Sequence, residues 1–164
     1  MIIFWLLPIS VIFHITEEFV FPGGFLGWYR NYKQTVSSSF TSTYIVLINS
    51  ILFILCALPL VLDGLQSISL WLSMASVVFF NALFHLNGSM KVRKYSPGIV
   101  TSVLLYIPIS IYGYWFILSN QLISKELAVS SSLVGIIYLL FSSFNHKRRA
   151  RKFELTKHGD TKKY

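Results

Sequence analysis

Five apolar stretches of roughly twenty residues each, separated by short polar segments, constrain this chain more than any other feature. They cover residues 2–21, 43–62, 68–90, 98–119 and 127–144. A helix needs roughly 20 mostly apolar residues to cross the hydrocarbon core of a bilayer, where every backbone polar group must be satisfied within the segment. The pattern therefore predicts an all-α fold, a polytopic transmembrane bundle of about five helices.

The composition supports this class of protein. Hydrophobic residues make up 54% of the chain and charged residues only 12%, whereas soluble domains carry about 25% charged residues. The single cysteine, Cys56, lies inside an apolar stretch, so neither an intramolecular disulfide nor a cysteine-based metal cage is expected. The phosphate-binding pattern G-x-x-x-x-G-K and the hydrolase pattern G-x-S-x-G are both absent, which argues against the common soluble hydrolases.

The first thirteen residues have the length of a signal-peptide core. No basic residue precedes this apolar run and no small-residue cleavage pattern follows it. His14 and two glutamates follow instead, and we expect a retained first helix.

Lysine and arginine are distributed unevenly between the connecting segments. The segments after the first and third stretches are basic, and eight of the fourteen Lys and Arg fall in the last twenty residues. The segment after the second stretch has none, and the segment after the fourth has only Lys125, beside Glu126. Because short cytoplasmic loops are enriched in Lys and Arg, we expect the N-terminus outside and the C-terminus in the cytoplasm, with the protein in the plasma membrane.

This distribution divides the chain into a transmembrane domain over residues 1–146 and a basic cytoplasmic tail over residues 147–164. We expect the tail to lie against anionic lipid. Nucleic acid is not an expected partner, because no aromatic stacking platform accompanies the charge. The segment FPGGFLGWYRNYKQT, residues 21–35, contains a helix stop and three aromatic side chains typical of the headgroup level, so we expect a short interfacial segment or one that folds back toward the helices.

Ionisable side chains at membrane depth are costly, and they usually mark a site. His14, Glu17 and Glu18 form H-x-x-E-E in the first stretch, and these spacings place both carboxylates on or beside the helix face that carries His14. Asn81 and His85 form N-x-x-x-H, one helical turn apart, in the third stretch. Other asparagines, including Asn49, are expected to make interhelical or turn contacts.

A rigid turn, Tyr95-Ser96-Pro97-Gly98, opens the fourth stretch. In the expected topology this turn, the glutamates and His85 all lie near the cytoplasmic side at similar depth. We therefore expect a polar pocket between the first, third and fourth helices.

In their order along the chain, these three motifs resemble the signature motifs of the HXXEE-domain family. The resemblance extends from the first helix into the fourth. It implies a bacterial integral membrane protein and marks the motif residues as the important ones, but it supplies no reaction.

The leading interpretation is a metal site in a membrane-embedded enzyme that acts on a lipid or other apolar small molecule. His14, His85 and one glutamate, assigned as Glu18, would bind zinc or non-haem iron and leave a position open. The other glutamate would act as general base. The residues assigned to catalysis are Glu17, Glu18, Asn81 and Tyr95.

Two other interpretations remain open at this point. A metal-free enzyme would use one protonated glutamate and a histidine in opposite acid and base roles, by fold-level analogy with membrane sterol isomerases of the emopamil-binding type. In a non-enzymatic protein, such as a small transporter or an immunity-type partner protein, the same groups would pair with one another and lock the helices together.

Overall fold

The structure, a computed structural model, describes residues 2–21, 23–32 and 41–160, and these form helices without a strand. The α-helices are α1 (Leu6–Val20), α2 (Gly24–Tyr32), α3 (Ser42–Ala57), α4 (Gly64–Val92), α5 (Ile99–Thr101), α6 (Ile107–Ser119) and α7 (Lys125–Asp160). Two 3₁₀ turns, Ile2–Trp5 and Leu58–Leu60, extend α1 and α3. Pro22 in the expected helix stop, residues 33–40 and the last residues of the tail lie outside the described parts.

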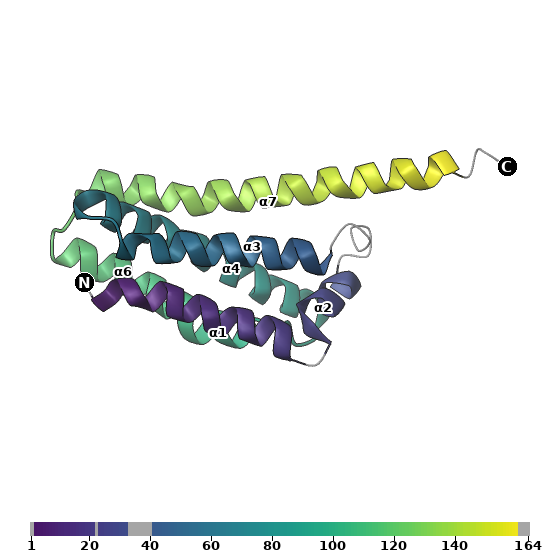
Figure 1. Ribbon diagram of the computed structural model, residues 1–164, viewed down its shortest axis with the longest axis horizontal. Helices are drawn as coiled ribbons and strands as arrows, with labels where there is room; N and C mark the ends of the chain where they lie inside the picture. Colours follow the sequence, from purple (N-terminus) through teal and green to yellow (C-terminus); the bar gives the residue numbers. More distant parts are fainter. Residues whose placement is uncertain (1, 22, 33–40, 161–164) are drawn as a thin grey trace.

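Five helical segments are long and apolar enough to cross a membrane, which confirms the predicted all-α, polytopic transmembrane fold. They are Ile2–Val20, Ser42–Leu60, Gly64–Val92, Ile99–Ser119 and Lys125–Asn145. In Figure 1 these helices lie roughly along one axis, and α7 extends well past the others at its C-terminal end. The last helix was expected to end near residue 144. It continues to Asp160, so the backbone of the basic tail is largely helical.

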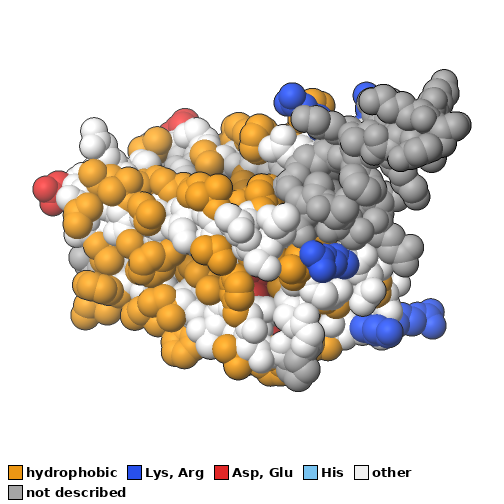
Figure 2. All heavy atoms as spheres, turned by 45° about the vertical axis from the view of Figure 1, so that its right-hand side comes forward, with side chains coloured by type: hydrophobic (Ala, Val, Ile, Leu, Met, Phe, Trp, Pro, Cys, Tyr) orange, Lys and Arg blue, Asp and Glu red, His pale blue; other side chains and the backbone are white. Residues whose placement is uncertain are grey.

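Large apolar side chains cover the outside of the bundle. Phe13, Ile54, Trp115 and Phe141 are each more than half exposed, and Figure 2 shows such side chains spread over one face while Lys and Arg gather toward one end. A soluble protein would bury these groups, whereas lipid is their natural solvent.

Helix α4 is the central element, and its close contact with α7 depends on small residues. The Ser76 hydroxyl donates to the carbonyl oxygen of Ser132 at 2.8 Å. A Cβ on Gly135 would lie 2.2 Å from Ser76 Oγ, so the two backbones can approach this closely only at a glycine. Close approach at small residues is the usual way in which membrane helices pack.

The aromatic segment after α1 folds back onto the bundle as α2. Phe25 and Tyr29 are buried, and their rings lie 6.5 and 6.3 Å from the ring of Phe84 on α4. Phe25 also lies 5.2 Å from the ring of His85. Of the two arrangements expected for this segment, the structure shows the one that folds back.

The fourth membrane segment is not a uniform α-helix. Between α5 and α6 it contains a π-helical turn, Ser102–Tyr106. Pro108 has no N–H to donate to the carbonyl of Leu104, which favours a local change of hydrogen-bond register. The wider turn ends at Tyr106, which is fully buried.

Candidate functional site

One carboxylate oxygen lies between two imidazoles in the interior of the bundle. His14 and Glu18 lie one turn apart on α1, and His85 comes from α4. Oε1 of Glu18 is 3.5 Å from Nε2 of His14 and 3.4 Å from Nε2 of His85. All three side chains are buried, and their ligand atoms lie within 4.8 Å of one another.

Two asparagine amides complete this cluster. Asn49 on α3 donates from Nδ2 to Oε2 of Glu18 at 2.8 Å, which leaves Oε1 turned toward the imidazoles. Asn81 on α4 donates from Nδ2 to Nε2 of His14 at 3.3 Å. Asn49 makes the interhelical contact expected of it, and its partner in that contact is Glu18 of the cluster.

The outer nitrogen of each imidazole meets a hydroxyl group from the segment that begins the fourth span. His14 Nδ1 lies 2.8 Å from Thr101 Oγ1, and His85 Nδ1 lies 3.1 Å from Ser96 Oγ. Thr101 also donates to Oε2 of Glu17 at 2.6 Å. Because a hydroxyl has one proton, Thr101 accepts from His14 Nδ1–H while it donates to Glu17. In the neutral imidazole, the lone pair of His14 Nε2 then points into the cluster.

Glu17 does not face the imidazoles but caps the start of the fourth span. Its carboxylate accepts from the backbone N–H of Val100 at 3.0 Å and of Thr101 at 2.8 Å, in addition to the Thr101 hydroxyl. The Tyr95 hydroxyl also donates to it. The two adjacent glutamates therefore serve different sites, as expected for neighbours about 100° apart on a helix.

Gly98 brings the turn at Tyr95–Gly98 against both imidazoles. A Cβ at this position would lie 2.7 Å from Cε1 of His14 and 2.8 Å from Cε1 of His85. The φ angle of Gly98 is 94°, in the region that favours glycine. The three sequence motifs therefore meet in space, with the turn packed against the two histidines.

Tyr95 reaches the cluster through Glu17. Its hydroxyl donates to Glu17, and its ring lies 5.2 Å from that of Phe21. Loss of water around the hydroxyl, the hydrogen bond to Glu17 and the charge of Glu17 together raise the pKa of Tyr95. Tyr95 is therefore a neutral hydrogen-bond donor at ordinary pH.

Aromatic rings enclose the histidines. The ring of Tyr106 lies 4.5 Å from that of His14, and the rings of Phe25 and Phe84 lie 5.2 and 5.7 Å from that of His85. Nothing in the sequence position of Tyr106 indicated that it packs against a motif histidine.

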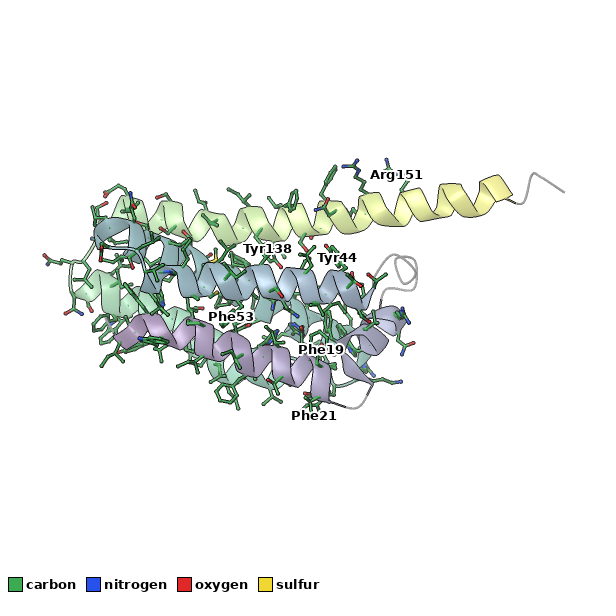
Figure 3. All side chains as sticks on the ribbon, viewed as in Figure 1. Phe19, Phe21, Tyr44, Phe53, Tyr138 and Arg151 are labelled. Atoms are coloured by element: carbon green, nitrogen blue, oxygen red, sulfur yellow. The ribbon has the colours of Figure 1, made fainter. Side chains whose placement is uncertain are left out.

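A cavity of about 130 Å³ adjoins the cluster between α3 and α7. Glu18, Asn49 and Asn81 form its polar part, and the remaining wall is mostly aromatic and aliphatic. Figure 3 shows Tyr138 on the side of α7 that faces α3, with Tyr44 near it. The cavity therefore joins the carboxylate of Glu18 to an apolar space.

Comparison with known proteins identifies the family. Residues 5–113 match a family described as protein of unknown function with HXXEE motif. The chain belongs to the HXXEE family. The match includes all the motif residues described above, from His14 to Gly98, which confirms the resemblance seen in the sequence.

A curated relative in this comparison is uncharacterized protein YrkK of Bacillus subtilis (strain 168). The two chains are 44% identical over 61 residues, which are 36% of this chain and 39% of the relative. The chain therefore aligns with well under half of that protein's length. No solved structure matches this chain.

Proposed function

We propose that His14, Glu18 and His85 hold a divalent metal ion, and that this HXXEE protein is a membrane-embedded enzyme acting on a lipid or other apolar small molecule. The observation that carries the proposal is the convergence of both Nε2 atoms on Oε1 of Glu18, at 3.5 and 3.4 Å. Ligands of a tetrahedral ion with bonds of about 2.0–2.1 Å stand about 3.3 Å apart. Two His and one carboxylate suit zinc or non-haem iron.

The hydrogen bonds around the cluster support metal binding. Metal-bound histidines usually donate their other ring N–H to an oxygen, which fixes the tautomer and the ring orientation. Thr101 and Ser96 are in place to accept those protons. In addition, Glu17 and Glu18 together carry the charge that balances a divalent ion.

A bound metal would polarise a substrate oxygen or make a bound water more acidic. The surrounding residues would hold the metal ligands in position. Asn49 holds Glu18 by one oxygen, and the Glu17–Thr101 pair holds His14. An ion would take the Nε2 lone pair that accepts from Asn81, leaving the Asn81 amide to donate to a ligand oxygen. The contacts of Glu17 favour this positioning role over that of general base.

A metal-free function has one specific observation in its favour. The Asn81 amide already donates to Nε2 of His14, so the lone pair has a partner within the protein. Under this alternative, Glu18 and the two imidazoles would exchange a proton in acid–base catalysis, or would only join α1 to α4.

Metal analysis separates the two functions. The protein should be purified without chelator, together with His14→Ala and His85→Ala, and with His158→Ala in the tail as a matched control. About one zinc or iron per chain is expected in the parent and in His158→Ala, and a large loss in the other two. Absence of stoichiometric metal in the parent would overturn the metal proposal.

We also propose that the C-terminus lies in the cytoplasm and that the protein resides in the plasma membrane. The basic segments after α1 and α4 and the C-terminal part of α7 support this, because Lys and Arg favour the cytoplasmic side. Lys147, Arg148 and Arg151 are exposed where α7 leaves the bundle, as Figure 3 shows for Arg151, and they would contact anionic headgroups. A C-terminal alkaline phosphatase fusion should be inactive and a fluorescent-protein fusion bright, and the reverse result would invert the topology.

A further inference from the structure

The cavity beside Glu18 is a candidate substrate pocket, and its position shows how a ligand would enter. Its walls come from α2, α3, α4 and α7, with Ile48 and Leu52 on one side and Leu139 and Ser142 on the other. Ser143 lines the cavity and is also exposed. The mouth of the cavity therefore lies beside Ser143 on α7, near the end of the fifth membrane segment at Asn145.

The polar end of the cavity can hydrogen-bond a ligand. Glu18, Asn49 and Asn81 lie there together, and the last two are amides that both donate and accept. The rest of the wall includes the rings of Phe80, Phe84 and Tyr138. A suitable ligand is thus apolar with one polar group at its inner end.

Charge restricts that polar group. Among the described residues that line the cavity, none is Lys or Arg. With a divalent ion bound, Glu17 and Glu18 leave the cluster near neutrality. A phosphate, sulfate or carboxylate would then bring an unbalanced negative charge to membrane depth, and an ammonium an unbalanced positive one, and both are unfavourable there.

Volume restricts the part of the ligand that enters. The cavity measures about 130 Å³, and an engineered apolar cavity of about 150 Å³ in another protein admits benzene. A ring or a short chain segment therefore fits beside Glu18, and a longer hydrocarbon would extend through the mouth into the bilayer.

We infer that the pocket between α3 and α7 binds an uncharged lipid-like alcohol or carbonyl compound, with its oxygen at Glu18, Asn49 and Asn81 and its hydrocarbon leaving toward the membrane. This inference rests on the proposed metal centre, because the ion supplies the charge balance. It names the substrate class of that site.

Photolabelling of the full chain in bilayer nanodiscs tests the inference. Three probes share a twelve-carbon chain with a diazirine near the head and end in an alcohol, a carboxylate or a primary amine. In protein with confirmed metal content, the alcohol probe should label α3 and α7 residues of the cavity at least tenfold more than either charged probe. Equal or stronger labelling by the carboxylate would overturn the inference.

Matched tryptophan variants locate the labelling. Ile48→Trp fills the cavity, whereas Leu47→Trp places the same ring on the outer side of α3, where Leu47 is 56% exposed. Labelling by the alcohol should fall at least tenfold in Ile48→Trp and stay unchanged in Leu47→Trp, with metal content retained in both. If labelling persists in Ile48→Trp, or lies mainly at Phe53 and Ile54 in the adjacent groove between α1 and α3, which shares Asn49 with the cavity, the pocket assignment is wrong.

Metal content distinguishes failure of this inference from failure of the proposed function. Bound metal with no preference for the alcohol contradicts the substrate class alone. If no metal is bound and the amine probe labels the cavity most strongly, the metal centre is contradicted. Without the ion, the carboxylates of Glu17 and Glu18 would be unbalanced and would attract the ammonium group.

Discussion

The Thr101 hydroxyl accepts a hydrogen bond from Nδ1 of His14 at 2.8 Å while it donates to Glu17 at 2.6 Å. One small side chain of the fourth membrane segment thereby connects two residues of the first segment that do not face each other. This connection sets which nitrogen of His14 is available to a metal.

Thr101→Val should lower metal affinity by about 10–100-fold, because Val keeps the shape of Thr but cannot accept the His14 proton or donate to Glu17. Thr101→Ser retains the hydroxyl and should remain within a few-fold of the parent. Competition with a zinc chelator measures both. Equal affinity in the Val and Ser variants would show that the hydroxyl does not position His14.

Gly98→Ala should destabilise the protein and impair metal binding together. The left-handed backbone alone costs an alanine about 1–2 kcal/mol, and its Cβ would also press on both imidazoles. Gly27→Ala on α2 is the control, since a Cβ there meets nothing within 4 Å. The unfolding temperature in detergent and the metal content should both fall in Gly98→Ala, and neither should fall in Gly27→Ala.

Substitution of the two glutamates should separate their roles. Glu18→Gln removes a ligand and should abolish stoichiometric metal binding. Glu17→Gln weakens hydrogen bonds to a charged acceptor, each worth about 1.5–3 kcal/mol, and should lower the unfolding temperature in chelator while a reduced level of metal remains. If both variants lost metal completely and were equally stable in chelator, this division of roles would be wrong.

Tyr95 should stabilise the protein only while its hydroxyl is protonated. Its pKa is raised in the folded state above the ordinary value of 10.0. The stabilisation is therefore fully present below pH 10 and is lost as the pH rises through the folded-state pKa. The parent should unfold at a higher temperature than Tyr95→Phe at pH 8, and the difference should shrink above pH 10. A difference that grew with pH would contradict the contact with Glu17.

The number of helices and the meeting of the three motifs could be predicted from the sequence. Hydropathy reports directly on membrane segments. Ionisable side chains at the same membrane depth avoid the lipid and face the bundle interior, where they meet one another. Thr101 and Asn49 could not be singled out, and the contact of the motif residue Ser96 with His85 could not be predicted. Hydroxyl and amide side chains are common in membrane helices, and only the packing of the helices shows which of them reach a histidine.

The separate roles of Glu17 and Glu18 also depend on packing. The H-x-x-E-E spacing places both near His14, but the rotation of α1 about its axis decides which carboxylate faces α4. The helical tail has a different cause. Hydropathy predicts where the apolar segment ends but not where the helix ends. Ala, Arg, Lys, Glu and Leu, which are common in the tail, all favour helix, so α7 continues after its membrane segment has ended.

The contact of Gly98 with both imidazoles has a consequence for biogenesis. A chain whose helices have inserted but have not yet associated has His14 on α1 far from His85 and from the turn that follows α4. The ligand set would thus exist only after the first, third and fourth membrane segments have docked. Metal would then bind and stabilise only correctly assembled bundles. Misassembled molecules would lack this stabilisation and would remain open to proteolysis.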